Sequence, residues 1–252
     1  MYFLKSLLGL LGLLALVSSQ GFAALYVVPT ANTSAEGNSS DDAPLGVSGQ
    51  RFQQVFSSAL LSAFPAGSQI LGLGLRVNGG ETALPAQTVT TFDIWIGQSL
   101  NAPGSLSATF ANNRGAGDLV RQGPLVISAG DFPGGATPNG FGVIPFDVPY
   151  GYTGGDLLIE IGYQGFSAGR NADAIYPFTA SQAQTAFGSG YSSLTANVGL
   201  YNEAIVFAFD LEPLAPVPEP AETGLLAIGV LATGIILHHF RKHWLQGLRS
   251  AD

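Results

Sequence analysis

The sequence has no cysteine, and its few histidines and lysines lie near the two ends. Histidine occurs at His238, His239 and His243, and lysine occurs at Lys5 and Lys242. Disulfide bonds, thiolate chemistry and cysteine-ligated metals are therefore excluded. Outside the tail there is also no histidine to act as a general base or as a zinc or iron ligand. A P-loop is excluded as well, because no Gly-Lys-Ser/Thr sequence occurs.

Charge is scarce, and positive charge is the scarcer sign. Asp, Glu, Lys and Arg together make up 10% of the 252 residues. Between residues 24 and 216, five arginines stand against fourteen carboxylates. An acidic segment without lysine is repelled by phosphate backbones, so nucleic acid is not an expected partner. Disorder is not expected either, because hydrophobic residues reach 46%.

Residues 1–23 have the three regions of a secretory signal peptide. Lys5 supplies the positive charge, residues 6–17 form a short apolar run, and small residues precede the expected cleavage between Ala23 and Ala24. A buried helix or a retained anchor is the alternative, but the run is short for a membrane span. We therefore expect a signal helix that is removed on export.

Residues 24–210 alternate between apolar and polar side chains, with clusters of Gly, Pro, Asn and Asp between the alternating stretches. The clearest stretches are residues 71–77, 92–96, 157–163 and 205–209. A period of two is typical of strands with one buried face and one partly wet face. We therefore expect an all-β ectodomain, an antiparallel two-sheet sandwich with a jelly roll as one form. Pro145 makes one expected strand either an edge strand or a bulged strand. Residues 182–187 are expected to form a helical turn.

The C-terminal part consists of three segments with different compositions. Residues 211–222 are rich in proline and cannot be helical, which predicts a stiff linker. Residues 223–240 carry no charge; these 18 residues would span about 27 Å as a helix, short for a hydrocarbon core of about 30 Å. Arg241 and Lys242 open a basic tail, residues 241–252, and predict a stop-transfer signal on the cytoplasmic side. We expect a single transmembrane helix, with a buried helix of a soluble domain as the alternative.

Val217, Pro218, Glu219 and Pro220, followed by the apolar segment and the basic residues, resemble the PEP-CTERM sorting signal of Gram-negative exosortase substrates. The resemblance implies that an exosortase, an integral-membrane protease, recognises the Pro-Glu-Pro region and removes the tail. The mature protein is then released or attached at the cell surface, usually in bacteria that make exopolysaccharide. Members of the family usually end soon after the basic residues, whereas this chain continues over residues 244–252. A proline-rich stalk on a permanent anchor is the alternative.

Four residues of the ectodomain are candidates for ligand contact: Trp95, Asn112, Asn113 and Arg114. An exposed indole at Trp95 would stack on the apolar face of a sugar, and the run from Asn112 to Arg114 would supply polar contacts. The alternatives are ordinary sheet packing for the tryptophan and a turn for the Asn-Asn-Arg run.

Carboxylates are the remaining catalytic candidates. A glycan hydrolase needs only two carboxyl groups, about 5–10 Å apart. Four carboxylates lie on or beside expected strands, where two of them could meet in space: Asp93, Asp147, Asp156 and Glu160. Solvated surface carboxylates are the alternative.

Calcium is the candidate cofactor that the sequence leaves open. Oxygen ligands are available from Asp41 and Asp42, and from the loops that contain Asp131 and Asp156. The spacing of these residues matches neither an EF-hand nor a nonapeptide repeat. No other cofactor is expected.

The leading hypothesis from the sequence is an exported, non-enzymatic protein of the cell surface or the extracellular matrix. Its precursor would be anchored in the inner membrane, and its partners would be an exosortase-like protease, the membrane and exopolysaccharide. Residues 51–55 and 109–113 are similar to the β-rich ectodomains that PEP-CTERM proteins often carry, and this similarity implies no activity. The alternatives are a carbohydrate-binding module and a secreted, carboxylate-dependent glycan hydrolase.

Overall fold

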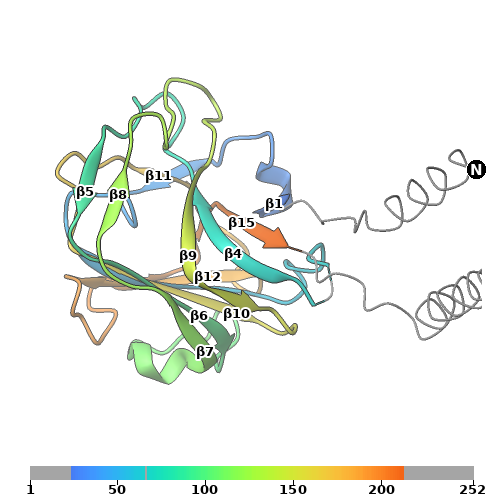
Figure 1. The fold of residues 1–252 in the computed structure, drawn as a ribbon. Helices are drawn as coiled ribbons and strands as arrows, with labels where there is room; N and C mark the ends of the chain where they lie inside the picture. The colour runs from blue at the N-terminus through green and yellow to red at the C-terminus, as the bar shows by residue number, and fades with distance from the viewer. Residues whose placement is uncertain (1–23, 66, 213–252) are drawn as a thin grey trace, which may run out of the picture. The chain divides into compact units, whose positions relative to one another are not determined.

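The structure is a computed structural model that describes residues 24–65 and 67–212. The signal helix expected over residues 1–23 and the transmembrane helix expected over residues 223–240 lie outside the described residues. The described part is all-β, as expected, and its strands pair antiparallel in several sheets (Figure 1).

Two large sheets contain most of the strands. The four-stranded sheet has the order β1 (Ala24–Val28), β15 (Phe207–Glu212), β4 (Gln69–Leu75) and β9 (Gly142–Gly151). The six-stranded sheet has the order β13 (Gly199–Tyr201), β12 (Ala183–Ser189), β3 (Gln50–Phe56), β10 (Leu157–Tyr163), β6 (Phe92–Ser99) and β7 (Arg114–Arg121).

Smaller elements complete the described part of the chain. A three-stranded sheet has the order β14 (Ala204–Ile205), β11 (Ala172–Ile175) and β2 (Ser39–Asp41), and β5 (Gln87–Val89) pairs with β8 (Leu125–Ile127). Two short 3₁₀ segments, η1 (Thr30–Asn32) and η2 (Phe110–Asn113), lie between strands.

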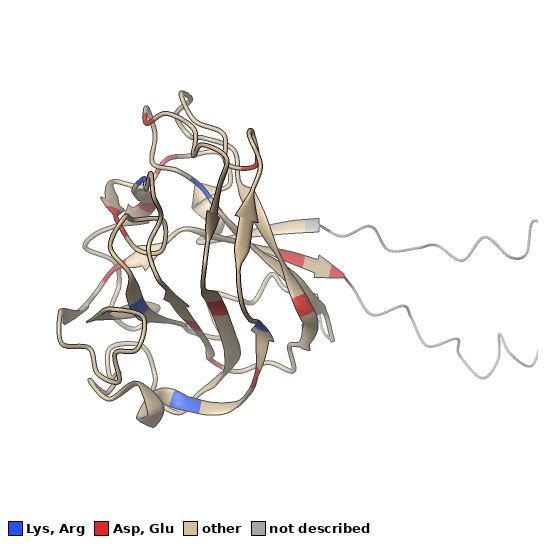
Figure 2. Cartoon of the chain, turned by 60° about the vertical axis from the view of Figure 1, so that its left-hand side comes forward, with Lys and Arg blue, Asp and Glu red and all other residues tan. Residues whose placement is uncertain are grey.

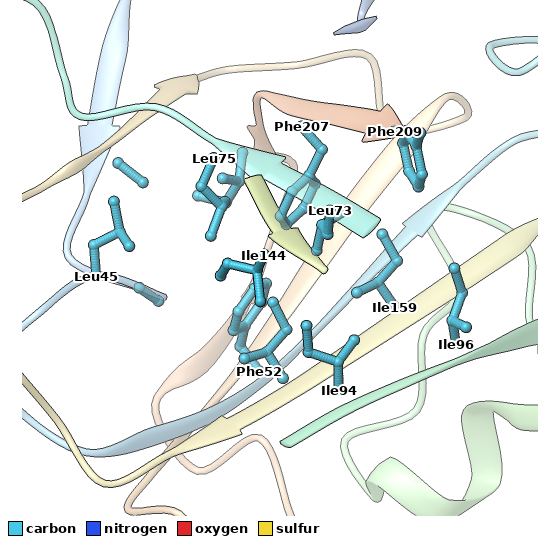
Figure 3. Close-up of a cluster of buried hydrophobic side chains, with 14 of the residues drawn as sticks. Leu45, Phe52, Leu73, Leu75, Ile94, Ile96, Ile144, Ile159, Phe207 and Phe209 are labelled. Carbon is cyan, nitrogen blue, oxygen red and sulfur yellow. The ribbon is translucent and has the colours of Figure 1, made fainter. Parts of the chain in front are cut away.

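The two large sheets face each other across one hydrophobic core. Side chains from both sheets meet there, among them Phe52 of β3, Leu73 of β4 and Phe207 of β15 (Figure 3). The rings of Phe52 and Phe207 stack across the gap with their centroids 6.5 Å apart and their planes 4° from parallel. The arrangement is therefore sandwich-like, and burial of this apolar surface is its main source of stability.

The alternation within β6 confirms the expected strand pattern. Phe92, Ile94 and Ile96 are each fully buried in the core, whereas Asp93 and Trp95 project from the opposite face and are half-buried. Successive side chains of a strand point to opposite faces, so the apolar residues at every second position are enough to set this orientation. β9 contains Pro145 and lies at an edge of its sheet, also as expected.

β10 departs from the expectation of one wet face. All seven of its residues are buried, including Leu158 and Glu160 on the face turned away from the core. The reason is a second hydrophobic cluster on the outer side of the six-stranded sheet, formed by Val55, Leu106, Phe110, Leu158 and Ala186. Leu106 and Phe110 belong to the segment between β6 and β7, which folds back over the sheet.

The helical turn expected over residues 182–187 is wrong. Residues Ala183–Ser189 form β12, which pairs with β3 along its whole length, from Ala183 opposite Phe56 to Ser189 opposite Gln50. The hydrogen bonds and side-chain burial that β3 offers outweigh a weak local preference for helix.

A buried ion pair joins the end of β4 to β11. Arg76 is 1% exposed and Asp173 is 0% exposed, and Arg76 Nε donates to Asp173 Oδ2 at 2.7 Å. Arg76 also donates to the backbone oxygens of Asn32 at 3.0 Å and Ala35 at 2.5 Å. Gly37 N donates to Asp173 Oδ1 at 2.8 Å. In a domain with few charged residues (Figure 2), this pair holds the segment that follows η1.

Candidate functional site

A row of three side chains crosses the outer face of the six-stranded sheet. Glu160 of β10 lies opposite Gln53 of β3 on one side and opposite Trp95 of β6 on the other. Directly paired residues of antiparallel strands project to the same face, so the three side chains point together away from the core. We treat this face, with the polar residues around Glu160, as the candidate site.

Glu160 is the centre of a charged cluster. Its carboxylate is 3% exposed and forms a two-point contact with Arg114, whose Nε donates at 2.8 Å. Gln53 Nε2 donates to Glu160 Oε2 at 2.6 Å, and Arg51 Nε lies 3.4 Å from Glu160 Oε1. A buried carboxylate is costly unless it is paired and hydrogen-bonded; here Arg114 and Gln53 donate to it, and Arg51 lies at ion-pair distance.

Trp95 lies beside this cluster on a surface made by two glycines. A Cβ atom added to Gly97 or to Gly117 would come within 2.5 Å of the indole, so both positions must remain without a side chain for the ring to lie there. The guanidinium carbon of Arg114 is 5.2 Å from the centroid of the Trp95 ring. This is a cation–π arrangement, and it connects the tryptophan to the arginine that holds Glu160.

A second arginine–aromatic pair lies on the other side of Glu160. The guanidinium carbon of Arg51 is 5.7 Å from the centroid of Tyr191. The hydroxyl of Tyr191 donates to Asp93 Oδ2 at 2.6 Å. Hydrogen bonding to Asp93, together with burial, raises the pKa of Tyr191, so this phenol stays protonated.

The two asparagine candidates have different roles in the structure. Asn113 is fully buried; its Oδ1 accepts from Ser107 N at 2.7 Å and its Nδ2 donates to Gln53 Oε1 at 2.7 Å. Asn112 is exposed, and its Nδ2 donates to Ser107 Oγ at 3.4 Å. Asn113 therefore holds the segment between β6 and β7 in its fold. The turn interpretation describes Asn113 better than ligand contact does.

Of the predicted contacts, the structure brings Trp95 and Arg114 together. Arg114 remains 36% exposed and Trp95 half-buried, so both present a polar and aromatic surface to solvent. Because the guanidinium has more donors than Glu160 and Trp95 occupy, it has capacity left for a hydroxyl or carboxylate. The chemistry of this surface suits a saccharide that offers hydroxyl or acidic groups.

Sequence reasoning did not connect Glu160 with Gln53, Arg51 and Tyr191. All except Tyr191 stand at alternating positions of expected strands, which predicts that they leave the core. These residues come together because their strands lie side by side in the sheet. An alternating pattern does not indicate which strands are neighbours.

Each candidate catalytic carboxylate accepts a hydrogen bond from another group of the domain. Asp93 Oδ1 accepts from Gly123 N at 2.9 Å, Asp147 Oδ2 from Gln122 N at 3.0 Å, and Asp156 Oδ1 from Ser58 N at 2.8 Å. Glu160 is held by the two arginines. Asp93, Asp147 and Asp156 therefore act as acceptors for backbone amides at turns and strand ends.

The calcium candidates divide into two groups. Asp131 accepts from Ser128 N at 2.7 Å within its own turn, and Asp156 accepts from Ser58 N. Asp41 and Asp42 instead line a hollow of about 130 Å³ together with Glu203. Burial raises the pKa of Asp41 to about 6, and burial together with the charge of Asp41 raises the pKa of Glu203 to about 8.

The residues expected to direct sorting lie mostly outside the described part of the chain. These are Ala23, the motif over residues 217–220 and the stop-transfer pair Arg241 and Lys242. Ala24, on the other side of the expected signal cleavage, is the first residue of β1. Within residues 24–65 and 67–212, the structure contains no helix with the length and apolar character needed to cross a membrane.

Comparison with known protein families, with curated proteins and with solved structures finds no match to this chain.

Proposed function

We propose that this chain is an exported, non-enzymatic protein of the cell surface or the extracellular matrix, sorted through a PEP-CTERM-like tail. The precursor is anchored in the inner membrane, and an exosortase-like protease separates the ectodomain from the tail. The ectodomain then contacts exopolysaccharide. One observation carries the proposal: the order of Pro-Glu-Pro at residues 218–220, the uncharged residues 223–240 and the basic pair Arg241 and Lys242.

Physical chemistry supports the role of the proline-rich segment. Each proline fixes its own φ and disfavours helix in the residue before it, so the sequence predicts an extended segment. A protease that binds extended chain gains affinity from a substrate that loses little entropy on binding. Glu219 offers a lone carboxylate to an arginine of the processing enzyme. The segment follows closely on β15, whose last residue is Glu212.

The proposal includes a finer description of the ectodomain as a two-sheet sandwich of the jelly-roll type. The shared core between the four-stranded and six-stranded sheets supports it. So does the way the chain alternates between sheets, since β3 belongs to the larger sheet and β4 to the smaller one. Such crossing connections are typical of Greek-key sandwiches.

Mass spectrometry of the exported protein tests the sorting proposal. In a Gram-negative host with an exosortase, the intact mass of the extracellular protein is expected to lack everything beyond the Pro-Glu-Pro region. A variant with Pro218→Ala, Glu219→Ala and Pro220→Ala is expected to keep the full tail, whereas the control Glu212→Gln is processed normally. Recovery of full-length protein alone, in the inner membrane, would contradict the proposal.

A second function, carbohydrate binding, is favoured by the surface around Trp95 and Arg114. Aromatic rings stack on the apolar faces of sugars, and an arginine with free donors binds hydroxyl or carboxylate groups. A glycan array would show binding that Trp95→Ala abolishes and that Tyr176→Ala, at an aromatic residue 51% exposed elsewhere, leaves intact. Uniform blanks with the folded wild-type protein would remove this function and the proposed contact with exopolysaccharide, but not the proposed processing of the tail.

A further inference from the structure

Two short sequences near the start of the described chain have the pattern Asn-x-Ser/Thr. One is Asn32-Thr33-Ser34 and the other is Asn38-Ser39-Ser40. In an exported protein this pattern, with any residue except proline in the middle, is an acceptor sequence for N-glycosylation. A glycan is bulky and hydrophilic, so the pattern has meaning only where the asparagine side chain reaches solvent.

Asn38 meets this condition. It is exposed and lies immediately before β2, a strand at the edge of the three-stranded sheet. Its Oδ1 accepts from Tyr176 N at 3.0 Å, and a backbone N–H only donates, so this bond identifies the amide oxygen. None of the residues that the structure describes accepts a hydrogen bond from Asn38 Nδ2. The nitrogen that would carry a glycan is therefore not taken up by the fold.

Asn32 fails the same condition. It belongs to η1 and is 6% exposed, and its Nδ2 donates to Ala35 O at 3.4 Å. Its backbone oxygen accepts from the buried Arg76 at 3.0 Å. A sugar on Asn32 would have to be accommodated inside this packed region, so the fold excludes it. The two acceptor sequences are thus distinguished by burial.

The sequence around Asn38 is also placed where an enzyme can reach it. β2 has three residues and pairs on one side only, with β11, and Ser40 within it is exposed. Opening of a short edge strand costs less free energy than unfolding of the whole domain. Such opening would also free the carboxylate of Glu36, whose Oε1 accepts from Gly79 N at 2.6 Å. This carboxylate, two residues before Asn38, could then pair with a basic group of the enzyme.

We propose that Asn38 is an N-glycosylation site, to which an oligosaccharyltransferase transfers a glycan from a polyprenyl diphosphate donor. A bond forms between Asn38 Nδ2 and C1 of the first sugar, and the bond between that C1 and the diphosphate oxygen breaks. The polyprenyl diphosphate leaves with the electron pair of the broken bond, and the amide nitrogen gives up one proton. The inference rests on the proposed export of the chain, because the transfer takes place outside the cytoplasm.

Mass spectrometry of the full chain tests the site in a Gram-negative host that supplies the transferase and its glycan donor. The wild-type protein is expected to carry one glycan, on Asn38. Asn38→Asp keeps the oxygen that accepts from Tyr176 N and is expected to lose the glycan completely. Ser40→Ala is expected to lose it as well, whereas Ser40→Thr retains it, because the pattern requires a hydroxyl at this position. The control Asn197→Asp, at an exposed asparagine outside both acceptor sequences, is expected to leave the glycan unchanged.

The outcomes separate this inference from the export proposal. Exported protein that has lost its signal peptide but carries no glycan on Asn38 would overturn the inference and leave export standing. A glycan on Asn32 in place of Asn38 would also overturn it. If the chain stays in the cytoplasm, the export proposal fails, and the purified full chain in non-ionic detergent is incubated with the purified transferase and its donor. Transfer to Asn38 then supports the site, and no transfer contradicts it.

Discussion

The ion pair between Arg76 and Asp173 allows the most direct test of how the domain is held together. Replacing Arg76 by methionine keeps much of the apolar side chain and its packing beside Phe141, whose ring centroid lies 5.0 Å from the guanidinium carbon. The substitution removes the cation, however, and leaves Asp173 buried with only its hydrogen bond from Gly37 N at 2.8 Å. It also removes the donors to the backbone oxygens of Asn32 and Ala35.

The expected loss is large because both partners are dehydrated. Arg76 is 1% exposed and Asp173 is 0% exposed, and breaking such a pair by removing one partner typically costs about 3–5 kcal/mol of unfolding free energy. Glu36 lies in the same region, and burial raises the pKa of its carboxyl group. Loss of the guanidinium would leave these two acidic groups without the positive charge that now offsets them.

Urea unfolding of the full chain in non-ionic detergent, followed by tryptophan fluorescence, measures this loss. The matched control is Arg121→Met, because the contact of Arg121 with Asp147 is 3.8 Å long and Asp147 is 56% exposed. A pair of that kind contributes about 0–1 kcal/mol. If Arg76→Met costs no more than Arg121→Met, the reasoning about the buried pair is wrong. The double variant Arg76→Met, Asp173→Asn is expected to lose less than the sum of the two single variants, because each single variant leaves one buried charge unpaired and the double variant leaves none.

Three further predictions concern the core, the tryptophan surface and the last strand. Phe209→Ala is expected to cost about 3–5 kcal/mol in the same urea titration, because Phe209 is fully buried and its ring lies 5.0 Å from that of Phe64. Gly117→Ala is expected to cost about 1–3 kcal/mol and to shift tryptophan emission to longer wavelength, since the new methyl group collides with the backbone of Ile96 and Gly97 and with the indole of Trp95. Gly151→Ala, which meets open space, is the control. A chain that stops after residue 206 lacks β15 and is expected to be digested by protease under conditions in which the full chain resists, because Phe207 and Phe209 leave the core.

Local patterning was sufficient to predict the strands but not their neighbours. Phe92, Ile94 and Ile96 identify β6 and its buried face, because a period of two is a property of a few consecutive residues. Arg76 and Asp173 are 97 positions apart, and nothing in the residues around either one indicates the other. The partners of a buried charge depend on which strands pair, and that is decided by the packing of the whole domain.

The candidate site also has features that the sequence predicts and features that only strand pairing decides. Trp95 and Arg114 stand out as separate candidates from their residue types, and they meet because β6 pairs with β7, with Ser99 opposite Arg114. Burial of Glu160 was not expected, since its strand alternates in the usual way. It follows from the segment between β6 and β7, which folds over the outer face through Leu106 and Phe110. A loop that returns to cover a sheet leaves no periodic signal in the sequence.

The topology of the four-stranded sheet is compatible with the proposed processing at both ends of the domain. β1 and β15 pair side by side, with Ala24 opposite Leu211, so the sheet is complete when the chain runs from Ala24 to Glu212. A cut after Ala23 leaves β1 whole, and a cut in the Pro-Glu-Pro region falls beyond β15. β15 itself lies between β1 and β4, however, so the four-stranded sheet cannot close before this final strand is available. The two proposed cleavages therefore fall outside the described strands, and the four-stranded sheet forms only when β15 is present.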